Sequence, residues 1–325
     1  MKRTHCKKWR ILLAVLTLSL ILCSCVQVAA TRPVTAEADM GERITRILIL
    51  GCDRSASLAD SIMLVAINET RREARILQIP RDTYAEYTSR SYKKLNGAIN
   101  ALGEERTEAF LEDALGVEIH CFVKLNPDAL VSIVNAIGGV EVEIPQDMDY
   151  SDPAQGLEIH LSAGKRRLTG AEAEQFVRYR SGYANADLGR LDAQKLFLSA
   201  LAKRCQRLSA MEMLKVAFYA MTKVQTNIGV HDAVRLAGVL RSCNAEKIPM
   251  ATLPGGAVRG VSGAWYYAVN REGGCRAVNE YLYPSRPLDV TEFDKKGVFD
   301  RESHPDFHAV YTAEEDKLAR LLDQL

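Results

Sequence analysis

Three short apolar runs lie close together in the first third of the chain, and each is bounded by polar residues. They cover residues 46–51, 61–67 and 74–80 and are rich in β-branched side chains. Such runs between turn formers predict strands, and runs without regular polar alternation are typical of strands covered on both faces. The polar segment 68–73 predicts a hairpin-like connection between the second and third strands.

Beyond these runs, helical and strand spacings alternate as far as residue 283. Two helix starts carry capping signals: Asn126-Pro127 places proline at the first helical position, and Thr169 with Glu172 forms a capping box. This repeated alternation predicts an α/β fold, with α-β-α layers around a central mixed sheet. The further predicted helices are 107–115, 128–137, 187–208, 210–224, 232–240 and 273–282, and the further predicted strands are 117–123, 140–144, 157–161, 247–254 and 265–269.

Two polar regions interrupt or follow this alternation. Residues 146–162 contain several aspartates and a proline, which predicts an exposed excursion. After Pro284 the chain is rich in proline and charge, except for residues 312–325, whose leucine spacing predicts a terminal amphipathic helix. Residues 284–325 are therefore interpreted as a tail that follows a domain at residues 44–283.

The amino terminus has the pattern of a membrane anchor. Residues 1–10 are basic and residues 11–30 form an apolar, uncharged run of about 20 residues, close to one bilayer crossing. Basic flanks stay in the cytoplasm, so residues 31–43 are predicted to be a linker and the rest of the chain extracytoplasmic. Leu22-Cys23-Ser24-Cys25 permits a second interpretation, a lipoprotein signal that leaves Cys25 lipidated. The lipoprotein interpretation removes the apolar run, but both interpretations tether the chain to the cell membrane.

Charge and cysteine content exclude some classes of protein. Lysine and arginine (42) nearly balance aspartate and glutamate (41), and no basic stripe or helix-turn-helix pattern predicts nucleic-acid binding. The eight cysteines lack the paired C-x-x-C spacing of a metal cage. Buried thiols are the ordinary interpretation, and an oxidising exterior leaves a disulfide between Cys243 and Cys275 open.

Acidic and basic residues stand at the ends of the three predicted strands. Asp53 and Asp60 flank the loop between the first two strands, and Arg81 follows the third. Ligands of open α/β sheets bind outside strand termini, so these side chains are candidates for one site. Two carboxylates suit Mg²⁺, which commonly takes one or two carboxylates plus phosphate oxygens. Arginine suits phosphate because its planar fork binds two oxygen atoms at once.

Two later segments add polar side chains to these candidates. Arg178 and Arg180 are two residues apart, so an extended backbone at residues 177–180 would place both guanidinium groups on one face. The next predicted helix carries three polar residues at spacings of three and four, and these share one helix face. They are Asp187, Arg190 and Gln194.

Six short motifs follow one another along the chain in a specific order. They are Leu50-Gly51-Cys52-Asp53, Asp60-Ser-Ile-Met-Leu-Val-Ala-Ile-Asn68, Gln78-Ile-Pro-Arg-Asp-Thr-Tyr84, Lys94-Leu-Asn-Gly-Ala98, Val177-Arg-Tyr-Arg180, and Asp187-Leu-Gly-Arg190 followed by Gln194. In this order they resemble the LytR-CpsA-Psr family of cell-envelope proteins. The resemblance covers roughly residues 47–208 and continues more weakly to about residue 283.

The resemblance implies an enzyme of cell-wall assembly. Members of the family look like transferases that move a glycopolymer from a polyprenyl-pyrophosphate lipid onto peptidoglycan and join it by a phosphodiester, and Mg²⁺ is the implied cofactor. Under this interpretation the sheet and helices 187–208 and 210–224 enclose the lipid tail. Residue by residue, the resemblance implies that Asp53 and Asp60 bind the metal, that Arg81, Arg178, Arg180 and Arg190 act on the pyrophosphate with support from Gln194, and that Asp53 or Asp187 is the catalytic base.

Two positions depart from the family's pattern. Leu58 stands two residues before the second aspartate, where the family usually has arginine, and Ala193 replaces the arginine beside the glutamine. Arg54, Arg90 and Lys93 are candidates to compensate. Two rival functions stay open: a phosphatase that uses water as acceptor for isoprenoid pyrophosphates, and a non-enzymatic protein that binds envelope polymers.

Overall fold

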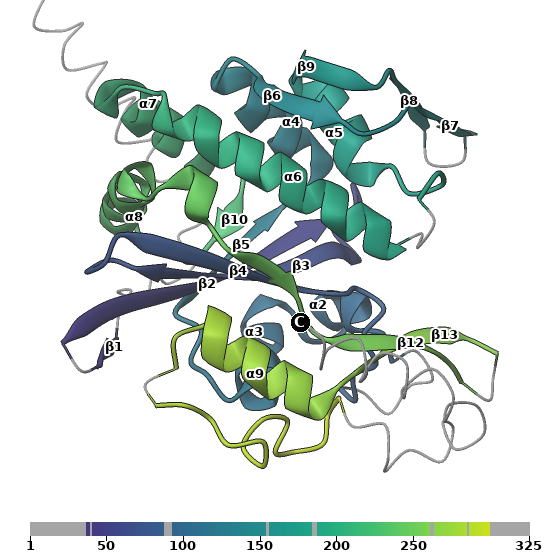
Figure 1. Cartoon of the computed structure of the whole chain (residues 1–325), viewed down its shortest axis with the longest axis vertical. Helices are drawn as coiled ribbons and strands as arrows, with labels where there is room; N and C mark the ends of the chain where they lie inside the picture. Colours follow the sequence, from purple (N-terminus) through teal and green to yellow (C-terminus); the bar gives the residue numbers. More distant parts are fainter. Residues whose placement is uncertain are drawn as a thin grey trace, which may run out of the picture.

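A seven-stranded mixed sheet occupies the middle of the molecule (Figure 1). The computed structural model describes residues 37–39, 41–87, 93–153, 156–183, 187–260, 263–284 and 286–299. The strands run in the order β10-β5-β2-β3-β4-β11, with β1 paired to β2. They are β1 (Glu37–Asp39), β2 (Glu42–Cys52), β3 (Ala59–Asn68), β4 (Glu73–Ile79), β5 (Cys121–Leu125), β10 (Gln225–Thr226) and β11 (Met250–Thr252).

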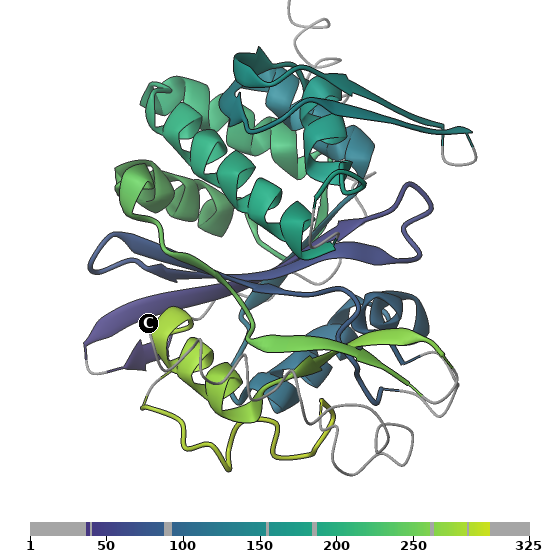
Figure 2. The ribbon, with the colours of Figure 1, turned by 45° about the vertical axis from the view of Figure 1, so that its right-hand side comes forward.

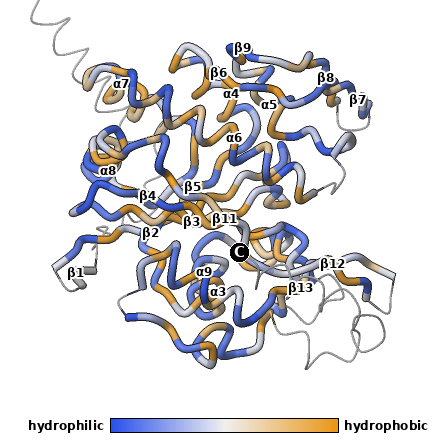
Figure 3. The backbone as a smooth tube through the Cα atoms, viewed as in Figure 1, coloured by the Kyte–Doolittle hydropathy of each residue, from blue (hydrophilic) through white to orange (hydrophobic). Residues whose placement is uncertain are grey.

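The three apolar runs form β2, β3 and β4, and β2–β3 and β3–β4 are antiparallel pairs at the centre of the sheet. β5 joins β2 and β11 joins β4 in parallel. The predicted central mixed sheet is therefore confirmed. Figure 3 shows hydrophobic positions gathered along these strands, as expected for strands covered on both faces.

The two faces of the sheet contribute to different cores, because alternate residues of a strand point to opposite sides. Leu48, Leu64 and Leu77 are fully buried against α2 (Ala98–Leu102), α3 (Glu104–Leu115) and α9 (Arg271–Tyr281). Ile47 and Val65 belong to a second core with α6 (Asp187–Gln206) and α8 (Val230–Ser242). Figures 1 and 2 show these helices on the two sides of the sheet, which confirms the α-β-α layers.

A further layer covers the outer side of α6 and has its own core, centred on Phe176, Phe197 and Ile159. Figure 2 shows the β7–β8 hairpin of this layer projecting from the body of the molecule. The layer contains α4 (Pro127–Ala136), β6 (Val140–Ile144), β7 (Met148–Asp152), β8 (Leu157–Leu161), β9 (Gly164–Leu168), α5 (Gly170–Arg178) and α7 (Ala210–Met221).

Several predicted strands have different bounds in the structure. The strand predicted at 117–123 begins only at Cys121, because α3 ends at the left-handed Gly116 and the chain must first return to the sheet. The Glu112 carboxylate accepts the Ile119 N–H at 2.7 Å in this connection. The strand predicted at 247–254 is only β11. The hairpin of β12 (Gly255–Arg259) and β13 (Trp265–Val269) follows it, and the short helices η1 (Leu95–Gly97) and η3 (Ala245–Lys247) complete the elements.

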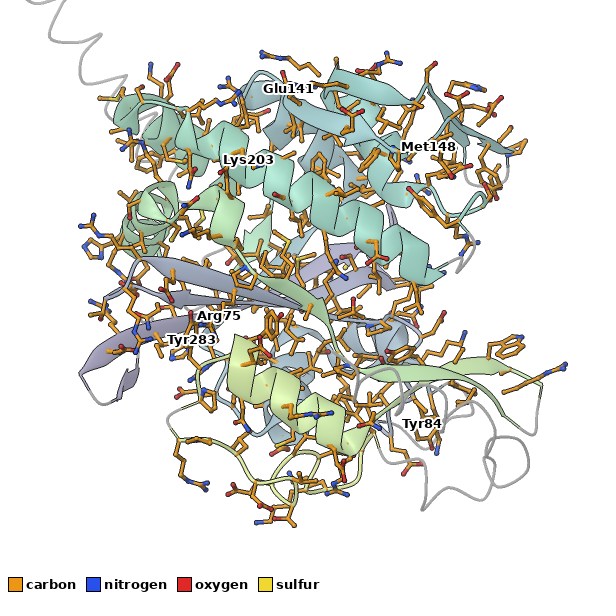
Figure 4. All side chains as sticks on the ribbon, in the orientation of Figure 1. Arg75, Tyr84, Glu141, Met148, Lys203 and Tyr283 are labelled. Carbon is orange, nitrogen blue, oxygen red and sulfur yellow. The ribbon has the colours of Figure 1, made fainter. Side chains whose placement is uncertain are left out.

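A buried arginine fastens the carboxyl-terminal end of the domain to the sheet. Arg46 of β2 donates from Nε to the Leu282 carbonyl at 2.7 Å, from Nη2 to the Tyr283 carbonyl at 2.6 Å, and from Nη1 to the Glu118 carbonyl at 3.2 Å. Figure 4 shows Tyr283 beside Arg75, whose guanidinium lies 4.3 Å from the centre of the tyrosine ring. Arg46 therefore joins residues 118 and 282–283, which are far apart in the sequence, to an inner strand of the sheet.

The described part of the predicted tail packs on the domain. Phe293 and Phe299 are almost fully buried in the core beneath the sheet, and the Asp294 carboxylate accepts the Phe299 N–H at 3.1 Å. The compact structure thus continues to residue 299, whereas the helix predicted at 312–325 lies outside the described residues.

The cysteines of the described residues are free thiols. Cys243 and Cys275 are free, buried thiols in cores on opposite faces of the sheet, so the suggested disulfide between them is wrong.

At the amino-terminal side, residues 37–39 of the expected linker already pair with β2. The predicted anchor at residues 1–30 lies outside the described part of the chain, and within that part no helix is both long and apolar enough to span a membrane.

Candidate active site

A bulge between β2 and β3 places Asp60. Gly51 pairs with Ser61 and Cys52 pairs with Ala59, so Asp60 is the extra residue on β3. Bulges commonly redirect a side chain beside a functional site. The Asp60 carboxylate forms an ion pair with Arg81, which follows β4, and its side chain remains 38% exposed.

Asp53 organises the loop that joins the same two strands. Its Oδ1 accepts the N–H groups of Ser57 at 2.8 Å and Leu58 at 3.2 Å, and its Oδ2 accepts the Ser55 hydroxyl at 2.6 Å. The Asp53 N–H in turn donates to the Leu58 carbonyl at 3.0 Å. Leu58, one of the two departures from the family's pattern, therefore contributes its backbone to holding the carboxylate in place.

These contacts set the pKa of Asp53. Partial burial alone would raise this pKa, but hydrogen bonds from Ser55, Leu58 and Ser57 to the carboxylate outweigh burial and lower it below the ordinary value. Asp53 is therefore ionised near neutral pH. Since its folded pKa is lowered, the stability that it contributes is present above the unfolded pKa and is lost as pH falls through the folded pKa.

A carboxyl titration followed by carbon NMR tests this assignment. We expect the Asp53 midpoint below the ordinary value of 3.8. The control is a Ser55→Ala, Ser57→Ala double variant, in which two donors to the carboxylate are lost and the midpoint should rise. A native midpoint above the ordinary value would mean that burial dominates and that the loop does not favour the carboxylate.

The first turns of α6 bring two predicted residues to the same strand ends. Arg190 is buried and its Nη2 donates to the Asp60 carbonyl at 3.0 Å. Gln194, one turn later, accepts the Ser61 hydroxyl at 3.1 Å and donates to the Val177 carbonyl at 3.3 Å. The predicted common helix face is therefore confirmed for Arg190 and Gln194. α6 begins at Asp187, whose side chain lies outside the described part of the structure.

The prediction of an extended arginine pair is wrong. The helix that starts at the capping box continues through Arg178, because the last turn of α5 pairs Arg178 Nη1 with Glu174 Oε1 at 2.9 Å across one helical turn. The backbone becomes extended only at Tyr179. Arg180 is exposed beyond the helix end, so the two guanidinium groups do not share a strand face.

Glu174 is a site residue that the sequence did not single out. Its side chain is largely buried, and its carboxylate also accepts Arg54 Nη2 at 3.0 Å. Arg54 reaches Asp128 of α4 as well, at 3.4 Å. The signal in the sequence was the four-residue spacing between Glu174 and Arg178 on a predicted helix.

The possible compensating cations have different surroundings. Arg54 joins the network around Glu174, which brings a cation next to Arg178. Lys93 forms an ion pair with Glu86, and Arg90 lies outside the described residues. Ala193 is buried in the core on the outer side of α6, where its small side chain packs among apolar residues.

The different burial of the two arginines predicts different effects on stability. We expect Arg178→Met to lower the free energy of unfolding by about 1–2 kcal/mol, because it removes one partner of the buried Glu174 carboxylate. Arg180→Met, the matched control at an exposed position, should change it by less than about 0.5 kcal/mol. Urea unfolding of both variants measures the difference, and equal losses would contradict the assigned pairing.

Comparison with known proteins identifies the family. The model of the LytR_cpsA_psr family matches residues 27–279, which includes the sheet, α6 and all the candidate site residues. The chain belongs to the LytR-CpsA-Psr family. The resemblance to this family that the order of the motifs indicates is therefore confirmed.

Two named relatives and one crystal structure are similar to most of this chain. It is 28% identical over 258 residues to the polyisoprenyl-teichoic acid–peptidoglycan teichoic acid transferase TagV of Bacillus subtilis, a match that spans 75% of this chain and 66%, just under two thirds, of the relative. It is 29% identical over 242 residues to TagU of Bacillus mycoides, which carries the same transferase name, over 72% of this chain and 76% of the relative. The crystal structure of B. subtilis TagV superposes with a TM-score of 0.65 at 25% identity, over 74% of this chain and 98% of that one.

Proposed function

We propose that this LytR-CpsA-Psr protein transfers a glycopolymer phosphate from a polyprenyl-pyrophosphate lipid to peptidoglycan. Support comes from the names of its relatives TagV and TagU, which describe those proteins as polyisoprenyl-teichoic acid–peptidoglycan teichoic acid transferases. The observation that carries the proposal is the junction at the β3 bulge, where the side chain of Asp60 meets Arg81 and its carbonyl meets Arg190. One carboxylate and two arginines at adjoining strand and helix ends form a site suited to a phosphate-rich ligand and a cation.

The proposed reaction exchanges one phosphorus–oxygen bond for another. A peptidoglycan hydroxyl oxygen attacks the phosphorus that carries the glycopolymer, and the bond from that phosphorus to the bridging oxygen breaks. Polyprenyl phosphate leaves, the hydroxyl proton passes to a base, and a phosphodiester remains. Arg81 and Arg190, with Arg178, are assigned to the pyrophosphate oxygens, where negative charge increases as the bridge breaks.

The polar residues fit a hard cation in their chemistry. Asp53 is held ionised, Asp60 has exposed carboxylate surface, and the Oε1 atom of Gln78 is buried beside Gln194 without a hydrogen-bond partner among the described residues. The described part of the chain has no cluster of three or more metal-ligating side chains, so phosphate oxygens would have to complete the coordination. In this proposal Asp53 and Asp60 hold Mg²⁺, which supplies charge neutralisation at the leaving phosphate.

The lowered pKa of Asp53 bears on its two proposed roles. A general base works best when its pKa is near the operating pH, but the pKa of Asp53 is lowered below its ordinary value. The cation role therefore fits Asp53 better than the base role. Asp187 begins the helix that carries Arg190, one turn away in sequence, and is the candidate that remains for the base.

The sheet face toward α6 and α8 suits the lipid tail. Its side chains are apolar and buried: Met63 and Val65 are 7% and 8% exposed, and Ile67 is at 0%. An apolar face between the sheet and two helices has the chemistry that a polyprenyl chain requires. Together with the anchor predicted at residues 1–30, it favours a protein at the outer surface of the cell membrane, where the lipid-linked polymer and peptidoglycan meet.

A reconstituted reaction tests the proposed function. The full chain in detergent is incubated with a labelled lipid-linked glycopolymer, peptidoglycan oligomers and Mg²⁺, and the label is followed into peptidoglycan. Transfer that stops on addition of a chelator and returns with Mg²⁺ is the expected result. Cleavage of the lipid without label in peptidoglycan would favour the phosphatase, and stable binding without cleavage would favour the polymer-binding protein.

A further inference from the structure

The β12–β13 hairpin is attached directly to the segment that carries Arg81. The Tyr267 N–H donates to the Asp82 carbonyl at 2.8 Å, and the Tyr84 N–H donates to the Tyr267 carbonyl at 2.9 Å. This is a parallel bridge, so the chain from Trp265 to Tyr267 runs in the same direction as the chain from Arg81 to Thr83. Trp265 therefore precedes the bridge by two residues on the hairpin strand, as Arg81 does on its own segment.

A second set of contacts fixes the base of the hairpin. Lys94 pairs with the Asp82 carboxylate at 2.9 Å and lies 5.9 Å from the Tyr266 ring, and Tyr84 packs edge-to-face on Tyr266 at 5.6 Å. Figure 4 shows Tyr84 where the hairpin leaves the body of the molecule. These contacts join the base of the hairpin to the segment that carries Arg81.

Trp265 is exposed on this hairpin, at the end of β13 next to the turn. Its side chain is 53% exposed, whereas Tyr267, two residues along the same strand face, is buried with its hydroxyl bonded to the Leu253 carbonyl. Arg259 lies directly across from Trp265 in the strand pairing, with its guanidinium 5.9 Å from the indole ring. An exposed indole held by a neighbouring cation offers a flat apolar surface beside hydrogen-bond donors.

We infer that Trp265 and Arg259 form a subsite for a glycan chain next to the phosphate site, an inference that rests on the proposed function. One face of a sugar ring presents C–H groups that pack on an indole, while its hydroxyls stay accessible to donors such as Arg259. A glycan that leaves a reacting phosphate at Arg81 passes along the hairpin. Both the polymer of the lipid-linked donor and the peptidoglycan acceptor have this chemistry.

Intrinsic fluorescence tests the subsite without any need for catalysis. The sequence contains two tryptophans, Trp9 and Trp265, so a full-length Trp9→Phe variant in detergent reports on Trp265 alone. Peptidoglycan oligomers and the lipid-linked glycopolymer are titrated separately, each against undecorated polyprenyl phosphate. A saturable change with either glycan supports the inference and identifies its source. No change with either glycan, or a change with plain anionic vesicles alone, overturns it.

Transfer kinetics separate this inference from the proposed function. Trp265→Ala should raise KM for the identified glycan about tenfold with kcat within about twofold, since stacking is lost but the reacting groups are untouched. Trp265→Tyr should restore much of the affinity, and Val290→Ala, an exposed apolar residue of the carboxyl-terminal segment, should have no effect. If the native protein shows no transfer, the proposed function fails while the fluorescence result still decides the subsite. Unchanged kinetics in Trp265→Ala would overturn the subsite alone.

Discussion

Replacement of Asp60 by asparagine is expected to lower kcat for glycopolymer transfer about 100- to 1,000-fold, the size of effect seen when one preorganised electrostatic contact to a transition state is removed. Asparagine has nearly the same shape but carries no charge, so it weakens both the hold on a cation and the pairing with Arg81. The residue is 38% exposed in its side chain, and the protein should remain folded. The measurement is the initial rate of label transfer at saturating donor.

The matched control is Asp192→Asn. Asp192 is an exposed aspartate on α6 that pairs with Lys195 at the helix surface, and surface ion pairs contribute little. Its replacement should leave the rate within about twofold of the native value. Equal activity of Asp60→Asn and Asp192→Asn would show that the carboxylate at the bulge takes no part in the reaction, and the assignment of the site would be lost.

Replacement of Arg46 by methionine is expected to lower the free energy of unfolding by about 3 kcal/mol, because one buried and two partly buried carbonyl groups lose their charged donor at once. Methionine has a similar length and no donor. The loss should also release the segment around Leu282 and Tyr283 from β2. Urea unfolding gives the free energy, and hydrogen exchange of residues 282–299 reports on the segment.

Arg43→Met is the matched control on the same strand. Arg43 lies near the start of β2, half of its side chain is exposed, and its ion pair with Glu69 spans 3.5 Å. Its replacement should cost less than about 1 kcal/mol. If both variants lose the same small amount, Arg46 does not hold the carboxyl-terminal segment, and another contact must do so.

The centre of the fold could be predicted because its strands are covered on both faces. The runs at 46–51, 61–67 and 74–80 carry continuous apolar residues, which leaves little ambiguity between strand and loop. β9 was missed for the opposite reason. Its residues Lys165, Arg166 and Arg167 are exposed, and only Leu168 is buried, so pairing with β6 rather than burial makes it a strand.

A site residue could be predicted from the sequence where a single strand end or helix turn determines its position. Asp60, Arg81, Arg190 and Gln194 were each positioned by a strand end or a helix turn, and the structure brings them together. The geometry of Arg178 and Arg180 was mispredicted because their backbone conformation depends on where α5 ends. The helix continues through Arg178, which pairs with Glu174 one turn earlier. The contact from Arg54 to Glu174 of α5, in contrast, depends on tertiary structure that local spacing does not encode.

The proposed function requires that this site passes the glycopolymer phosphate to a sugar hydroxyl and not to water. The most direct measurement is the reaction of the full chain with lipid-linked glycopolymer and peptidoglycan oligomers in ¹⁸O-labelled water, followed by mass spectrometry of the phosphate-containing products. Transfer predicts a polymer–peptidoglycan phosphodiester that contains no ¹⁸O, with polyprenyl phosphate as the other product. Release of the polymer with one ¹⁸O on its phosphate, and no joined product, would show that water is the acceptor and that the protein is not a transferase.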